Sequence, residues 1–203
     1  MGNWKIEMKF HLILWLLVFA VPSGLSGQSS VSTKKPLQNI PQLIADLADS
    51  DFLTNYSAGS KILKIGKDAE PYLLKALDHK KGKVRLAAII LLDQMEDKRA
   101  IPEFVRIFKD HQRNEGERAA CALSLGRMGA KDASPLLIQG LSENSDTIKS
   151  SCALALVILK EEKAVPYLIK LSQDKEKEIG KIALSALNSI GNNAIPELER
   201  LLK

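Results

Sequence analysis

The sequence has few aromatic residues and none of the short motifs that mark common enzyme sites. Phe, Trp and Tyr make up 5% of the 203 residues, and both tryptophans, Trp4 and Trp15, lie near the start. There is no Gly-x-Ser-x-Gly, no His-Glu-x-x-His and no phosphate-binding loop, so the corresponding hydrolase, zinc-protease and nucleotide sites are not expected. No segment alternates apolar and polar residues over the length of a strand, which argues against a β-sheet protein.

Long apolar runs are also missing, with one exception near the start. Leu12–Val21 reads LILWLLVFAV, ten apolar residues that follow Lys5 and Lys9 and precede the small-residue stretch SGLSGQSS. This order is typical of a secretory signal peptide, so we assign 1–27 to a signal peptide and 28–37 to a flexible linker. The run is shorter than the ~20 residues of a membrane-spanning helix, which favours cleavage over the alternative, an uncleaved anchor.

Cleavage would change the composition of the chain. The remaining 176 residues would have no Trp and would carry 27 Lys and Arg against 23 Asp and Glu. This small excess is not clustered, so no nucleic-acid partner is expected. Met1 and Met8 are alternative starts, and Gly27 and Ser26 are alternative last residues of the signal peptide. The predicted location is periplasmic or extracellular, with a membrane-anchored chain facing outside as the alternative.

Prolines recur at a nearly constant interval. The set is Pro41, Pro71, Pro102, Pro135, Pro166 and Pro196, with spacings of 30, 31, 33, 31 and 30 residues. Five stand in an Ala-x-Pro frame, while the first has Asn39 in place of Ala, and two residues after each proline comes Leu or Phe. A period between 20 and 50 residues indicates a solenoid built from one repeated unit.

Each unit has the pattern of two helices joined by a polar loop. Proline is tolerated in the first turn of a helix, and Asp68 and Asp132, just before Ala-x-Pro, are candidate N-caps. A loop such as DHKKGK leads to a second, Ala-rich helix such as VRLAAIILLDQM. The predicted fold class is all-α: an α-solenoid of stacked antiparallel helix pairs over 38–203, with five pairs and a final helix from Ala194.

This repeated pattern resembles HEAT repeats of the short bacterial type that is also found in phycobilisome lyases. The residues that carry the resemblance are Val84-Arg85, Glu117-Arg118, Ile148-Lys149, Gly66, Gly126, Gly129 and Gly191. In the fifth unit Gly180 takes the place of the basic residue and Lys181 follows it. The resemblance implies about five and a half repeats whose second helices line a concave face.

A basic residue stands near the start of four successive second helices. These residues are Arg85, Arg118, Lys149 and Lys181. On a concave face such a ladder would bind an acidic partner. The favoured alternative is structural: each would form an ion pair with an acid in the loop before it. The expected partners, in order, are Asp78, Asp110, Glu143 or Asp146, and Asp174.

Histidines and cysteines also occupy repeat-equivalent positions. His79 and His111 each follow an Asp in a polar loop and are interpreted as solvated loop residues rather than metal ligands. Cys121 and Cys152 fall on adjacent second helices. Packed helices are about 8–10 Å apart, whereas a disulfide needs Cα atoms within about 7 Å. Both cysteines are therefore predicted to be buried free thiols, with a disulfide as the alternative; no metal or cofactor is expected.

The resemblance also brings catalytic alternatives. The di-iron deoxyhypusine hydroxylases with this fold use repeated His-Glu pairs, and this chain contains no His-Glu dipeptide. We predict a non-catalytic, exported, monomeric scaffold that binds a protein or peptide on its concave face. The first alternative is a bilin-lyase-like enzyme or accessory protein, and the second is a membrane-tethered scaffold.

Overall fold

The computed structural model describes residues 39–173 and 178–191, and every regular element in these residues is a helix. The first helices of the pairs are α2 (Ile40–Asp46), α4 (Glu70–Ala76), α6 (Ile101–Lys109), α8 (Ser134–Gly140) and α10 (Val165–Ser172). The second helices are α3 (Phe52–Ile65), α5 (Gly82–Gln94), α7 (Glu115–Arg127), α9 (Asp146–Leu159) and α11 (Glu178–Ile190). The predicted signal peptide 1–27, the linker 28–37 and the helix from Ala194 lie outside the described residues.

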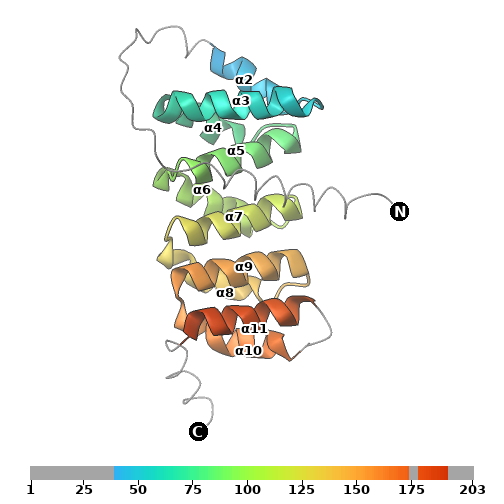
Figure 1. Cartoon of the computed structure of the whole chain (residues 1–203), viewed down its shortest axis with the longest axis vertical. Coiled ribbons are helices and arrows are strands. Elements are labelled where there is room, and N and C mark those ends of the chain that lie inside the picture. Colours follow the sequence, from blue (N-terminus) through green and yellow to red (C-terminus); the bar gives the residue numbers. More distant parts are fainter. Residues whose placement is uncertain (1–38, 174–177, 192–203) are drawn as a thin grey trace, which may run out of the picture. The chain divides into compact units, whose positions relative to one another are not determined.

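The helices pack as the repeat predicted. Each first helix contacts the second helix of its own pair, and α3, α5, α7, α9 and α11 contact one another in succession. Figure 1 shows these second helices one below the next, with the first helices behind them. This arrangement confirms the predicted α-solenoid for the described residues.

The apolar positions of the Ala-x-Pro frame build the core. Leu43, Leu73, Phe104, Leu137 and Leu168, each two residues after a proline, are 0–4% exposed. The alanines of the frame are 0–5% exposed in the four units where they are described. Full burial of a Leu or Phe side chain contributes roughly 1.5–3 kcal/mol, so this column stabilises every described repeat. Because these alanines are enclosed by neighbouring residues, a larger side chain in their place would collide with those neighbours.

The capping prediction for Asp68 and Asp132 was wrong. Both lie inside short 3-10 turns, η2 (Gly66–Ala69) and η4 (Lys131–Ala133), that run directly into the first helices. The N-cap residues of α4 and α8 are therefore alanines, and neither cap has a side-chain hydrogen bond. The turn already orients the chain for the helix, and the following proline has no N–H group that would need a cap.

The second helices end in one shared backbone conformation. The residue one or two positions after the helix has a positive φ in every described repeat: Gly66, Glu96, Gly129, Lys160 and Gly191, at 69°, 52°, 70°, 54° and 62°. Glycine adopts this left-handed conformation without steric cost, whereas Glu and Lys do not. The repeat geometry therefore imposes the conformation even on the two residues that disfavour it.

Candidate binding surface

The two arginines of the predicted ladder link neighbouring repeats. Arg85, the fourth residue of α5, donates from Nε to both carboxylate oxygens of Glu117 at 3.0 Å and from Nη2 to Oε1 at 2.7 Å. Arg118, the fourth residue of α7, donates to the two oxygens of Glu143 at 2.8 and 2.6 Å. Glu117 lies on the next second helix and Glu143 in the loop after α8, so each arginine reaches forward along the stack.

The prediction that Arg85 pairs with Asp78 and Arg118 with Asp110 was therefore wrong. Asp78 is bound instead by Arg106 of α6, at 3.1 and 3.0 Å, and by Arg113. Stacking places the next repeat as close to a loop as the loop's own helix, and spacing along the chain does not reveal that neighbour. Desolvation raises the pKa of the Asp78 carboxyl, but the hydrogen bonds from the two arginines outweigh it and leave the pKa below its ordinary value.

The two lysines of the ladder make local contacts. Lys149 Nζ lies 3.1 Å from Asp146, one of the two partners expected for it, and Lys181 Nζ lies 3.4 Å from Glu178. The partner expected for Lys181, Asp174, is outside the described residues. Both pairs span three positions of one helix, and the Lys181 side chain is 65% exposed. Because both partners of each pair belong to one helix, neither pair links two repeats. Surface pairs of this kind contribute about 0–1 kcal/mol.

Arg118 is built into the interior rather than presented to solvent. Its side chain is 8% exposed, its Nε donates to the Phe108 carbonyl at 2.8 Å, and its guanidinium lies 5.3 Å from the centroid of the Phe108 ring. The hydrogen bond from Arg118 holds the pKa of the Glu143 carboxyl below its ordinary value of 4.5. This geometry favours the interpretation of the two arginines as structural ion pairs; binding of a partner by the ladder stays a prediction.

Apolar side chains lie on the solvent-facing side of three adjacent second helices. Ile90, Leu123 and Leu154 are the ninth residues of α5, α7 and α9, so the repeat brings them into one row. Ile90 and Leu123 are half-buried, Leu154 is 46% exposed, and Ile158, one turn further along α9, is 42% exposed. We call these four residues the second-helix patch. Periodicity alone missed it because the helices are apolar on several sides.

Comparison with known proteins identifies the repeat. A family model described as HEAT repeats matches residues 70–157 and 107–188, more than half of the chain. The chain belongs to the HEAT repeat family. No curated protein matches the sequence significantly.

Three solved structures share the HEAT-like fold of this chain. The complex of CpcE and CpcF of phycocyanin lyase from Nostoc sp. PCC7120 has 21% identity and a TM-score of 0.64, covering 74% of this chain and 98% of that one. Human deoxyhypusine hydroxylase has 21% identity and a TM-score of 0.52, covering 78% and 65%. An engineered protein has 19% identity and a TM-score of 0.50, covering 75% and 79%. Identities this low establish the shared fold alone.

The remaining chemistry-bearing residues are dispersed through the HEAT repeats. Cys121 and Cys152 are free and buried, as predicted, and burial raises the pKa of both thiols. His79 Nδ1 accepts a hydrogen bond from the backbone N–H of Lys81 at 3.1 Å. Within 39–173 and 178–191 no three His, Cys, Asp or Glu residues are grouped so that they could hold a metal ion. No helix in those ranges is both long and apolar enough to cross a membrane.

A second exposed apolar group lies on α3, which begins the row of second helices. Phe52, Leu53 and Tyr56 are 51, 72 and 53% exposed, and the Phe52 and Tyr56 rings stack with centroids 5.9 Å apart. Asp51 caps this helix through a hydrogen bond from the Thr54 N–H at 2.8 Å. These side chains lie on the first two turns of α3, whereas the residues of the second-helix patch lie on the later turns of α5, α7 and α9.

Proposed function

We propose that this HEAT repeat protein is a non-catalytic scaffold that binds a protein or peptide through the second-helix patch. The observation that carries the proposal is the exposure of Leu154 and Ile158 beside the row formed by Ile90 and Leu123. Large apolar side chains gathered on neighbouring elements of a soluble domain mark interaction surfaces. The patch lies on the second helices, which in this family line the concave face where the sequence predicted the partner.

The inter-repeat ion pairs support a rigid binding surface. Glu117 is 3% exposed and is held by Arg85, and Arg118 is held by Glu143 and Phe108. Bidentate pairs of this type fix geometry as well as adding stability. A surface that is already ordered loses less conformational entropy when a partner binds. The similarly folded phycocyanin lyase structure is itself a complex of two proteins, which is consistent with a protein partner.

Paired substitutions test the patch. In the variant with both Leu154→Ser and Ile158→Ser, a protein retained from native envelope extract by the tagged chain should no longer be retained. The matched control is Tyr72→Ser on first helix α4, since Tyr72 is also partly exposed, at 38%. Equal retention by the patch variant and the control would contradict the proposal. Circular dichroism of each variant establishes that the helices are intact.

The non-catalytic part of the proposal has its own test. The purified chain should show no visible absorbance and no stoichiometric metal. A bound chromophore or metal would instead favour the lyase-like or another enzymatic alternative.

We further propose that the chain is exported after removal of 1–27. The proposal rests on the basic start, short apolar run and small-residue exit of the sequence. Both tryptophans, Trp4 and Trp15, precede the predicted cut, so a cleaved protein should show only tyrosine fluorescence. N-terminal sequencing of the protein recovered outside the cytoplasm should start at Gln28 or Gly27, and an intact N-terminus on a membrane-bound protein would favour the anchored alternative.

A further inference from the structure

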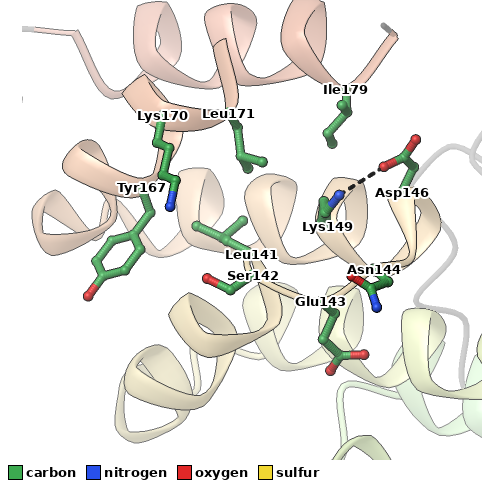
Figure 2. Close-up of a pocket in the computed structure, with 10 residues that line it drawn as sticks. All are labelled: Leu141, Ser142, Glu143, Asn144, Asp146, Lys149, Tyr167, Lys170, Leu171 and Ile179. Carbon is green, nitrogen blue, oxygen red and sulfur yellow. Dashed lines mark hydrogen bonds and ion pairs between the residues drawn. The ribbon is translucent and has the colours of Figure 1, made fainter. Parts of the chain in front are cut away.

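A pocket of about 320 Å³ lies between the last two described repeats, away from the second-helix patch residues. Its lining comes from the loop after α8, the first turn of α9, one side of α10 and the start of α11. Figure 2 shows the lining residues around one space, with the ends of the Tyr167, Glu143 and Asp146 side chains directed away from it. The volume is at the lower end of the range for small-ligand pockets, which suits one or two side chains of a peptide.

The base of the pocket is apolar. Leu141 and Ile179 are 2 and 4% exposed and belong to the packed interior, and Leu171 adds a third apolar side chain. The side chain of Tyr167, 45% exposed, stands at the pocket with its hydroxyl directed outward (Figure 2). An apolar side chain of moderate size would therefore leave water on entering this space, while a neighbouring polar group could stay near the opening.

The charged residues of the lining differ in whether they have a partner of opposite charge. The two acidic residues in the lining are neutralised, Glu143 by Arg118 and Asp146 by Lys149. The amine of Lys170 has no hydrogen bond or ion pair with any residue in the described ranges. Figure 2 shows it beside Tyr167, directed toward the loop that begins at Leu141. Among the described residues, Lys170 is thus the cation of the lining that has no acidic partner.

An earlier repeat shows what is missing at this place. Arg106 stands four residues after its proline, as Lys170 does, and it is bound by Asp78 from the preceding loop. Asp78 stands seven residues after its own proline, and the equivalent residue in the loop after α8 is Ser142. The same position that supplies an internal carboxylate in one repeat therefore supplies only a hydroxyl beside Lys170.

We propose that this pocket binds an acidic side chain followed by an apolar residue in a peptide segment of a partner. The carboxylate replaces the missing acid at Lys170, and the apolar side chain covers Leu141, Leu171 and Ile179. The inference rests on the proposed function in one respect, that the ligand is a polypeptide.

The test uses blocked tetrapeptides and the full chain labelled with ¹⁵N. Acetylated and amidated Gly-Glu-Leu-Gly should shift amide signals of residues 141–149 and 167–171 in a saturable way. Gly-Gln-Leu-Gly and Gly-Glu-Ser-Gly should each bind at least about tenfold more weakly, as expected when a charge-assisted hydrogen bond or an apolar contact is lost. Equal binding of the Glu and Gln peptides, or no saturable shift at these residues, would overturn the proposal.

Two variants locate the charge. Lys170→Gln should weaken Gly-Glu-Leu-Gly binding about tenfold, and Ser142→Asp should do the same because it supplies the acid from within the protein. Lys131→Gln, which removes one exposed charge outside the lining, is the control and should leave the dissociation constant unchanged. The amide spectrum itself reports whether each variant is folded. Unchanged affinity in both pocket variants contradicts the assignment.

The source of the negative charge is tested separately. The same titration is carried out with acetyl-Gly-Leu, which has a free C-terminal carboxylate, and with inorganic phosphate. A higher affinity for either probe than for Gly-Glu-Leu-Gly at the same signals would overturn the side-chain assignment. The variant with Leu154→Ser and Ile158→Ser should bind this peptide as the parent chain does. Failure of the pocket and failure of the second-helix patch are thus distinguished.

Discussion

The interface between α5 and α7 and the next one, between α7 and α9, use one repeat position in opposite ways. The twelfth residue of α5 is Asp93, and the twelfth residue of α7 is Gly126. Asp93 is 4% exposed, interacts with Ser124 and lies 3.2 Å from Arg127. A Cβ on Gly126 would lie 2.5 Å from the Cα of Ala155, so here the helices approach backbone to backbone. One interface is polar and spaced, and the other is apolar and close.

The difference extends to the surface. Arg127 and Ile158 are the thirteenth residues of α7 and α9. The type of each depends on the twelfth residue of the preceding second helix. Where a buried Asp93 must be neutralised, the thirteenth residue is an arginine committed to it. Gly126 has no side chain and no charge to neutralise. The thirteenth residue of the next helix, Ile158, is therefore not needed as a counter-ion and faces solvent within the second-helix patch. The choice of contact inside the stack thus decides what the stack presents outside.

The largest expected effect is at the close interface. Gly126→Ala should lower the free energy of unfolding by about 3 kcal/mol, because the new methyl group would meet the backbone of Ala155, which has no flexible end to move aside. Urea denaturation measures the change. The control is Gly59→Ala in α3, where the nearest atom is 3.7 Å from the new Cβ and a stabilisation of about 0.5–1 kcal/mol is expected. Similar effects of both substitutions would contradict the distinction drawn for Gly126.

The next largest loss of stability is expected at the polar interface between α5 and α7. Arg127→Met should cost about 3 kcal/mol at neutral pH by leaving the Asp93 carboxylate buried without its cation. Desolvation already raises the pKa of Asp93, only partly offset by Arg127. A raised pKa means that stability is lost as pH rises, so the cost should shrink as the solution is acidified and Asp93 takes up a proton. Urea denaturation at a series of pH values from 7 to 5 measures it.

The double variant with Asp93→Asn and Arg127→Met is the control for this dependence. It should show little change in cost over the same pH range, because the titrating carboxyl is gone. A cost of Arg127→Met that is constant with pH would show that Asp93 is not the group responsible.

A smaller effect is expected at the inter-repeat ion pair of Arg118. Glu143→Gln should cost about 1 kcal/mol at pH 7, since the Glu143 side chain is 23% exposed. The pKa of Glu143 is lowered by Arg118, so its contribution is present above the ordinary value of 4.5 and is lost as pH falls through the lower folded-state value. Thermal unfolding should therefore show parent and variant converging below pH 4.5, a more acidic window than for Arg127→Met.

The smallest expected effect tests the helix ends. Lys160→Gly should raise the free energy of unfolding by about 1 kcal/mol, because Lys160 has the same positive φ that Gly129 has one repeat earlier. Lys163→Gly is the control, since Lys163 is not among the described non-glycine residues with positive φ, and it should be neutral or destabilising. If both variants were more stable than the parent, the cause would be the loss of a lysine side chain rather than relief of the positive φ.

The repeated features could be predicted because they recur in the same register. The prolines, the buried residue two positions later and the order of helices follow from a period of about 30 residues, and the structure confirms all of them where it describes the chain. Asp68 and Asp132 were assigned wrongly because a capping residue and a residue inside a 3-10 turn occupy the same place in sequence. Only the backbone of the turn separates these two possibilities.

The candidate sites depended on contacts between repeats. Sequence spacing placed Arg85 and Arg118 correctly at helix starts, yet their carboxylate partners are 32 and 25 residues away. The second-helix patch and the pocket at Lys170 depend in the same way on which sides of the helices other helices cover.

The sequence by itself determined the α-solenoid, its HEAT repeat and the buried face of each first helix, because burial of a regular apolar pattern is encoded within each unit. Only the tertiary structure decided that Asp93 and Gly126 make opposite interfaces, that Arg118 is structural, that Ile158 is exposed, and that Lys170 has no acidic partner among the described residues. Those outcomes arise where two repeats meet, and there the distance between side chains is set by packing rather than by position along the chain.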